Sequence, residues 1–187
     1  MSEKNEVLDA IKSRRSIRKY RSLQIKNEEV EMILEAGRYA PSANNEQPWH
    51  FTVIQNPEML QIINTVALKG MLQSDLEWHR NMAANSAFKV TYDAPTLIVV
   101  SGRIDAIAPA VDCAAAMENM LVGAQSLGVG SVWLGLVRFF FADAGELAKL
   151  GIPAGYKPFY SAAFGYPVDG TAVTAPKRNG DVINWLK

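Results

Sequence analysis

A single long run of small and apolar residues, 109–127, constrains the fold more than any other part of the chain. As a helix this run would be about 27 Å long, and its polar residues recur at intervals of about seven, so only a narrow stripe could face water. The remaining faces are rich in alanine and glycine, which allow neighbouring helices to approach closely. Gly128 follows at the position where a helix typically ends. We therefore predict a central helix that is packed on several sides.

Around this run, the spacing of apolar residues predicts a series of further helices and strands. The expected helices are residues 4–13, 27–39, 57–69 and 143–150, and the expected strands are residues 49–55, 96–101, 131–137 and 159–167. The strand at 96–101 is continuously apolar, which is typical of a strand covered on both faces. Residues 70–90 carry no clear pattern. The order of these elements predicts one α+β domain, residues 1–187, built on a mixed sheet.

The composition limits the partners that the protein can have. Nineteen Lys and Arg residues balance nineteen Asp and Glu residues, so the molecule has no long-range attraction for nucleic acid or for an anionic membrane. No apolar run approaches the roughly 18 residues that a membrane span requires. The first residues are charged, and a single cysteine, Cys113, cannot form an internal disulfide. We therefore expect a globular, cytoplasmic protein with no nucleic-acid and no membrane partner.

Several kinds of chemistry can be set aside from the sequence. The two histidines, His50 and His79, lie too far from each other and from Cys113 to form a familiar metal-ligand spacing. Cys113 falls within the predicted central helix, where a free cysteine is more often core packing than a nucleophile. The string LGVGSVWLG has Trp133 where a dinucleotide fingerprint needs its third glycine. We predict no metal site, no Rossmann domain and no catalytic side chain.

Basic residues are concentrated near the N-terminus. Five of the nineteen fall in positions 14–21, and a second basic pair, Lys177 and Arg178, lies near the other end. If the segment stays helical, Arg14 and Arg18 share a face, and Ser16 could donate a hydrogen bond to a phosphate oxygen. A solvated basic surface is the plainer alternative. Nucleic-acid binding is less favoured, because the net charge is zero and the aromatic residues lie in strand-like segments.

The string APSANNEQPWHF, residues 40–51, predicts a polar and conformationally restricted loop between a helix and a strand. Such loops often turn amide side chains toward a ligand, although ordinary turn chemistry would also explain the composition. Together, the basic segment, this loop and the glycine-containing strand could supply a phosphate anchor, amide partners for a heteroaromatic ring, and a close approach of backbone.

In order and spacing, the strings RRSIRKY, APSANNEQPWHF, YDAP before TLIVV, SLGVGSVWLG, FGYP and PKR resemble the nitroreductase family of flavin enzymes over nearly the full chain. The resemblance implies an α+β sandwich with a central mixed, mainly antiparallel sheet flanked by helices. It also implies an intertwined homodimer with FMN at each of two sites built from both chains. A dimer would cover the apolar residues of the C-terminal tail, 182–186.

The resemblance also implies a set of cofactor-binding residues. Arg14, Arg15 and Ser16 would hold the FMN phosphate and the ribityl oxygens, and Arg18 would lie near the pyrimidine edge of the flavin. Lys177 or Arg178 would return to the phosphate. From the partner chain, Pro41, Ser42, Ala43 and Asn45 would line the flavin and Gln47 would support their loop. Backbone groups of Trp133, Leu134 and Gly135 would meet the N5 and O4 side of the ring, and Asn85 and Lys89 are further candidates.

The implied activity is a ping-pong oxidoreduction in which NADH or NADPH reduces FMN and a nitroaromatic, quinone or similar small-molecule acceptor reoxidises it. With fewer than 190 residues the chain would be a small member with an open site and a lid around residues 69–89. A member with specialised chemistry, such as dehalogenation or flavin fragmentation, or with weak turnover would keep the same FMN residues. A non-flavin interaction protein with a basic surface is the remaining alternative.

Overall fold

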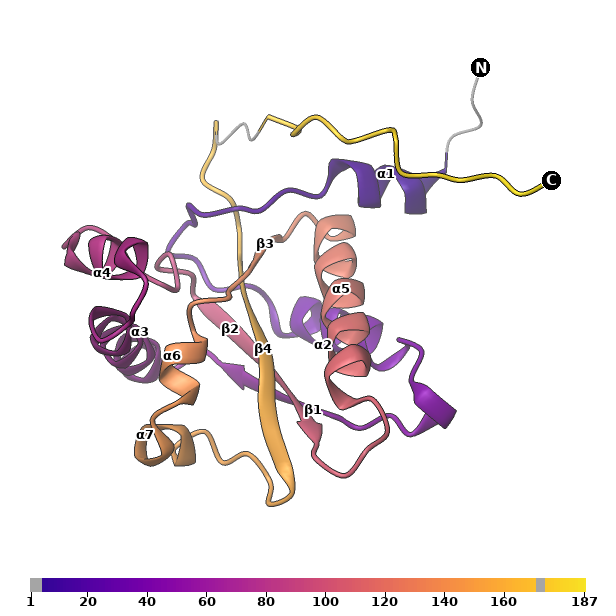
Figure 1. Cartoon of the computed structure of the whole chain (residues 1–187). Coiled ribbons are helices and arrows are strands. Elements are labelled where there is room, and N and C mark those ends of the chain that lie inside the picture. Colours follow the sequence, from indigo (N-terminus) through magenta and orange to yellow (C-terminus); the bar gives the residue numbers. More distant parts are fainter. Residues whose placement is uncertain (1–4, 171–173) are drawn as a thin grey trace.

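The computed structural model describes residues 5–170 and 174–187, and Figure 1 shows a central sheet with helices on both of its faces. The helices are α1 (Glu6–Ser13), α2 (Asn27–Arg38), α3 (Pro57–Leu72), α4 (Glu77–Ala84), α5 (Pro109–Ser126), α6 (Arg138–Phe141) and α7 (Ala144–Ala148), with a 3₁₀ turn, η1 (Ala43–Asn45). The strands are β1 (Trp49–Ile54), β2 (Thr96–Arg103), β3 (Gly130–Trp133) and β4 (Tyr156–Gly165). Lys4, the first residue of the predicted 4–13 helix, lies outside the described residues.

The four strands form one sheet in the order β1-β2-β4-β3, and all three pairings are antiparallel. An isolated parallel bridge joins Ser16 to Ser131 at the β3 edge. The predicted fold class, a mainly antiparallel sheet flanked by helices, is therefore confirmed for the single chain. The last strand in the sequence, β4, is not at the edge of the sheet but lies between β2 and β3.

Alternate residues of β2 belong to two separate cores, as its uninterrupted apolar sequence predicts. Leu97 and Val99 pack with α3 and α6 on one face of the sheet. Ile98 and Val100 pack with α2 and α5 on the other face. Both faces of this strand are therefore removed from water.

The predicted central helix is present as α5. Its buried residues are Asp112, Cys113, Ala116, Met117, Met120, Leu121 and Ala124. Gly128 takes the left-handed conformation, φ 74°, that ends the helix. Cys113 is a free, fully buried cysteine whose pKa is raised to about 12 by burial and by the neighbouring Asp112. The interpretation of Cys113 as core packing is thus supported.

Two local expectations differ from the structure. Helix α1 ends at Ser13, as predicted, and Arg14 has the extended ψ of 132°, so the segment does not stay helical and Arg14 and Arg18 do not share a helical face. The predicted strand 131–137 ends at Trp133, and α6 begins at Arg138. In both places a tertiary contact with the sheet decides the backbone conformation, as the next section describes.

Residues 174–187 are exposed and carry no regular secondary structure. The tail is drawn on the side of the molecule where α1 lies (Figure 1). Within the single chain the apolar tail side chains remain exposed: Val182, Ile183, Trp185 and Leu186. Across the described residues, no helix is both long enough and apolar enough to span a membrane.

Candidate functional site

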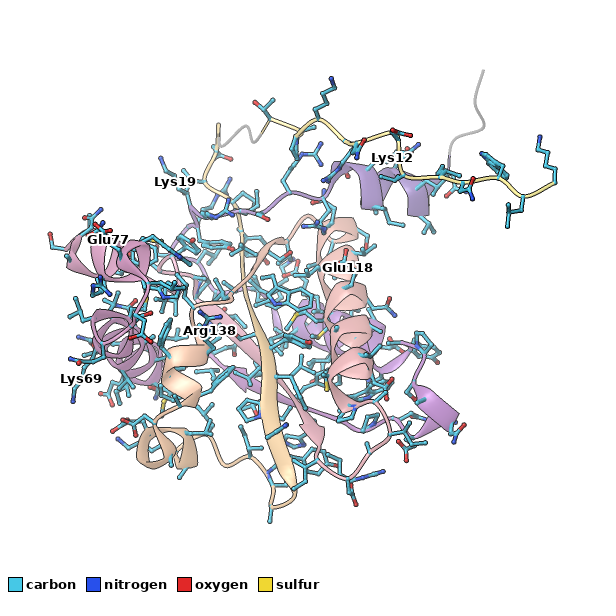
Figure 2. All side chains as sticks on the ribbon, viewed as in Figure 1. Lys12, Lys19, Lys69, Glu77, Glu118 and Arg138 are labelled. Atoms are coloured by element: carbon cyan, nitrogen blue, oxygen red, sulfur yellow. The ribbon has the colours of Figure 1, made fainter. Side chains whose placement is uncertain are left out.

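The first feature of the site is the basic segment, residues 14–18, which leaves the end of α1 and runs to the edge of the sheet. Arg14 caps α1 through its backbone N–H, which donates to the Ala10 carbonyl, and its side chain is 23% exposed. Arg14 Nε lies 3.6 Å from Glu118 Oε1, about midway along α5 (Figure 2). The Arg14 guanidinium is therefore held on one side by a carboxylate and is open to solvent on another.

A bridge between Ser16 and Ser131 fixes the basic segment to β3. The Ile17 N–H donates to the Ser131 carbonyl over 2.9 Å, and the Ile17 side chain is buried. A Cβ at Gly130 would lie 2.9 Å from Ile17 Cγ1, so the glycine makes this close approach possible. The bridge and the buried Ile17 side chain therefore hold the middle of the basic segment against the sheet, whereas Arg18 beside them is exposed.

The other two arginines of the basic segment have partners within the chain. Arg15 Nη1 donates to the carbonyls of Lys12 and Arg14, each over 2.7 Å. Arg18 is exposed, and its Cζ lies 5.8 Å from the centroid of the Tyr92 ring. Burial raises the pKa of Tyr20, which nearby Arg18 partly offsets, and the Tyr20 hydroxyl donates to the Ile17 carbonyl. The Arg18 guanidinium thus stands over an aromatic surface beside the sheet edge.

Just after the end of β3, Gly135 is exposed, whereas both backbone groups of Leu134 are bonded within the chain. The Leu134 N–H donates to the Ser161 carbonyl over 2.8 Å, and the Ser161 hydroxyl donates back to the Leu134 carbonyl. The Trp133 ring packs edge-on against Tyr160, with centroids 4.9 Å apart. Gly135 is exposed, and no described atom outside its chain neighbours lies within 4 Å of the place where a Cβ would stand. A flat molecule could therefore approach this backbone closely.

The amide loop, residues 41–47, is the third predicted part. Asn44, Asn45 and Gln47 have left-handed φ angles of 49°, 57° and 45°. The Ser42 hydroxyl accepts a hydrogen bond from the Gln47 N–H over 3.0 Å, and Gln47 Nε2 donates to Asn45 Oδ1 over 3.0 Å. Pro41 is exposed and Ala43 is half-buried. The loop is therefore a defined structure that presents amide groups at the surface.

The amide loop and the basic segment meet α5 at different places within one chain. The Ala43 N–H donates to Asp112 Oδ1 in the first turn of α5, whereas Arg14 pairs with Glu118. Glu118 lies six positions after Asp112 in the helix, a rise of about 9 Å. The basic segment thus lies against β3 through the Ser16 bridge. The amide loop contacts α5 nearer its N-terminal end than the basic segment does.

The four remaining candidates lie elsewhere. Asn85 caps the end of α4, and its Oδ1 accepts from the Ala87 N–H. Lys89 Nζ forms an ion pair with Asp93 over 2.7 Å, and both line a polar cleft of about 620 Å³ beside α3. Lys177 and Arg178 are exposed in the tail. Among the contacts described for these four residues, none links them to the basic segment in the way that the bridge to Ser131 links Ser16 to β3.

Two polar features of the region have no counterpart in the sequence interpretation. His79, on α4 within the predicted lid, is buried, with Nδ1 2.6 Å from the Ser74 hydroxyl and Nε2 3.4 Å from Arg138 Nη2. Burial, together with the charge of Arg138 at the start of α6 (Figure 2), lowers the pKa of His79. The other feature is Asp112, one of the polar residues of the central helix that were expected to face water. It is instead buried, at 4% exposed, and only its contact with the Ala43 N–H explains its position.

Comparison with known proteins shows which family the chain is similar to. Residues 11–166 match the model of the nitroreductase family. A relative from Archaeoglobus fulgidus, named as a candidate NADH dehydrogenase/NAD(P)H nitroreductase, is 38% identical over 164 residues, which are 88% of this chain and 87% of the relative. A relative of the same name from Methanothermobacter thermautotrophicus is 35% identical over 170 residues, 89% of this chain and 80% of the relative.

A solved structure extends the comparison to the fold. The crystal structure of a nitroreductase with bound FMN from Bacteroides fragilis matches with a TM-score of 0.91 and 34% identity, covering 98% of this chain and 100% of that chain. The family match includes the basic segment, the amide loop and all four strands, and it ends before Lys177 and Arg178. The resemblance seen in the sequence is confirmed, and the chain belongs to the nitroreductase family.

Proposed function

We propose that the protein is an FMN-dependent oxidoreductase that takes electrons from NADH or NADPH and passes them to nitroaromatic, quinone or similar acceptors. The whole chain, residues 1–187, would make one FMN-binding domain, and two copies would make the active molecule. The family, the NAD(P)H-linked names of the archaeal relatives and the FMN in the B. fragilis structure support this proposal. One buried free cysteine is compatible with a reducing cytoplasm, where we place the reaction.

The observation that carries the proposal is the bridge between Ser16 and Ser131. It attaches a cationic segment to a strand whose far end exposes the backbone at Gly135. From Ser131 to Gly135 an extended chain covers about 13 Å. An anionic group held by the basic segment and a flat ring laid against Gly135 would therefore belong to one elongated ligand. FMN has these two ends, a phosphate and a flavin ring, joined by a ribityl chain.

The residues at the phosphate end suit an anion. Arg14 would supply guanidinium donors and Ser16 a hydroxyl donor, and charge-assisted hydrogen bonds are stronger than those between neutral groups. Arg15 would support the segment, because its Nη1 is already used by two carbonyls. Lys177 or Arg178 would close over the phosphate from the tail.

At the ring end, Arg18 would lie near the pyrimidine edge, and Trp133, Leu134 and Gly135 would present backbone to the other edge. When bound, FMN supplies hydride acceptance from NAD(P)H and electron transfer to a second substrate. The Arg18 guanidinium would favour negative charge on the pyrimidine side. Asn85 and Lys89 stay as proposed contacts of the same edge, since they lie in the last part of the predicted lid and precede Tyr92, which Arg18 contacts.

A second copy of the chain would complete the site. Every described residue of α1 is at least partly exposed, including Val7, Leu8 and Ile11, although the helix is amphipathic. An apolar face of this kind on a helix is typical of an interface. The amide loop, held away from the basic segment of its own chain, would then supply Pro41, Ser42, Ala43 and Asn45 to the partner's flavin, with Gln47 as support.

The purified protein tests this proposal directly. We expect a yellow protein that releases FMN, rather than FAD, on denaturation, because the basic residues suit a terminal monophosphate. Steady-state oxidation of NADH and NADPH with a quinone and with a nitroaromatic should give the parallel double-reciprocal lines of ping-pong kinetics. A colourless protein that does not bind added FMN would reject the proposal. FMN binding without NAD(P)H turnover would instead indicate a specialised family member.

A further inference from the structure

The amide loop has a backbone that requires external support. Three of its four residues from 44 to 47 are non-glycine residues in the left-handed region, at φ angles of 49°, 57° and 45°. Such conformations are costly for residues with a side chain and persist where the surrounding structure holds them. Hydrogen bonds within the loop fix its shape: the Gln47 N–H donates to the Ser42 hydroxyl, the Gln47 side-chain amide to Asn45, and the Asn45 and Glu46 N–H groups to the carbonyls of Ser42 and Ala43. They do not fix its position on the protein.

Two carboxylates attach the loop to the rest of the chain, one from a residue outside the loop and one from a residue within it. Asp112, in the first turn of α5, accepts a hydrogen bond from the Ala43 N–H over 3.1 Å. Glu46, within the loop, accepts one from the Ile107 N–H over 2.8 Å, just before α5 begins. Arg103 Nη2 lies 3.6 Å from the other oxygen of Glu46. The loop is therefore attached on both sides to the N-terminal end of the central helix.

Asp112 is an unusual residue to find in a core. It is 4% exposed, and among the residues that the structure describes its Oδ2 has no hydrogen-bond partner. A buried carboxylate that uses only part of its bonding capacity is unfavourable, although the positive end of α5 reduces this cost. An apolar residue would pack the same position more favourably. The benefit of the carboxylate at this position is the bond to the Ala43 backbone.

We propose that Asp112, together with Glu46, is a positioning residue for the cofactor: it fixes the backbone of the amide loop so that Ser42 and Asn45 meet the flavin of the partner chain. This inference rests on the proposed function. Asp112 would touch neither the cofactor nor a substrate, and it would act through the Ala43 N–H. Its removal would therefore weaken FMN binding at a site that belongs to the other subunit.

The experiment compares Asp112→Ala and Asp112→Asn with the wild-type protein. Alanine removes the acceptor, whereas asparagine keeps an amide oxygen that can still accept from Ala43. Glu58→Gln is the matched control, because Glu58 is also an acid in the first turn of a helix, α3, away from the amide loop. For each variant we would measure the FMN dissociation constant well below the unfolding temperature, the thermal midpoint of the apoprotein, and the exchange rate of the Ala43 amide hydrogen.

We expect Asp112→Ala to raise the FMN dissociation constant by about tenfold and to accelerate Ala43 exchange by a similar factor. The FMN dissociation constant of Asp112→Asn should stay within about threefold of the wild-type value, and that of Glu58→Gln should equal the wild-type value. If Asp112→Ala does not fold, Glu46→Ala, at a half-buried position, should weaken FMN binding in the same way. Rescue of FMN binding by asparagine would support positioning, because asparagine keeps the oxygen that accepts from the Ala43 N–H. A purely structural role would change the thermal midpoint without changing the FMN dissociation constant.

A lower thermal midpoint with an unchanged FMN dissociation constant would overturn the inference. Unchanged exchange at Ala43 in Asp112→Ala would also overturn it, since the bond would then not hold the loop. Failure of the proposed function has a different signature. The wild-type apoprotein would not bind FMN at all, which removes the role in cofactor binding, while the exchange measurement would still report whether Asp112 anchors the loop.

Discussion

Arg14 Nε lies 3.6 Å from Glu118 Oε1, so the residue that ends α1 is held against the middle of the central helix. The Arg14 side chain is still 23% exposed beside this contact. A partly exposed guanidinium can form charge-assisted hydrogen bonds to a phosphate, so Arg14 is the first residue to test.

Arg14→Ala should weaken FMN binding by about ten- to a hundredfold, because charge-assisted hydrogen bonds to a phosphate contribute roughly 1.5 to 3 kcal/mol. Flavin that remains bound should keep a near-normal midpoint potential. Fluorescence titration with FMN measures the affinity. Lys12→Ala, which removes an exposed cation from α1, is the control and should leave the affinity unchanged. Equal losses in the two variants would show that only general positive charge matters.

Arg18→Ala should instead lower the midpoint potential of the bound flavin. A cation beside the pyrimidine edge favours the reduced form, and a loss of 1.4 kcal/mol corresponds to about 30 mV for a two-electron couple. Spectroelectrochemical titration at saturating FMN measures the shift, and Arg18→Lys should retain most of the potential. An unchanged potential in Arg18→Ala would mean that this side chain does not face the ring.

Ile11→Asp should produce monomers that bind FMN poorly. Ile11 is 49% exposed on the apolar side of α1, so a charge there should leave the fold of the single chain intact while disrupting an interface with a second copy. Light scattering and FMN titration measure the two effects. Leu23→Asp changes an exposed leucine away from α1 and should stay dimeric. A wild-type monomer with fully bound FMN would contradict the two-chain site.

The free energy of unfolding should fall as the pH is lowered below about 6.5. Burial and the Arg138 charge lower the pKa of His79 in the folded protein, whereas the unfolded chain takes up the proton at its ordinary pKa. As the pH falls, His79 is therefore protonated in the unfolded chain at a higher pH than in the folded protein. The stability present above about pH 6.5 is lost as the pH falls toward the lower pKa of the folded protein. Urea unfolding between pH 5 and 8 tests this. The dependence should weaken in His79→Gln and persist in His50→Gln.

Patterns that repeat along one element were sufficient to predict that element. The small-residue run gives α5 to within one residue of its predicted end, and the continuous apolar run gives β2 with residues in two cores. Both depend on side chains that the element itself carries. Residues 70–90 have no such repeat, and α4 within them is held by contacts of buried His79 with Ser74 and Arg138.

The failures come from contacts between distant segments. The sequence leaves open that the helix continues through Arg18, but the Ile17 N–H donates to the Ser131 carbonyl and holds the segment along β3. The strand predicted to 137 stops because residues after Leu134, the last to bond β4, turn into α6. The family resemblance selected the residues of the site, whereas their anchors, Asp112 and Glu46, are recognisable only once the fold brings them to Ala43 and Ile107.

The strand order has a consequence for how the protein is made. β4 pairs with both β2 and β3, yet of the four strands it is the last to be synthesised, and its register sets Thr96 opposite Phe164. Until β4 emerges from the ribosome, β2 has only β1 as a partner, and the apolar faces of Ile98 and Val100 lack the strand that completes their layer. Pairings this distant in sequence form slowly, and unpaired strand edges attract other chains. A chain released before Tyr156 would therefore be prone to aggregate, and chaperone demand during synthesis should be greatest in the interval just before this last strand appears.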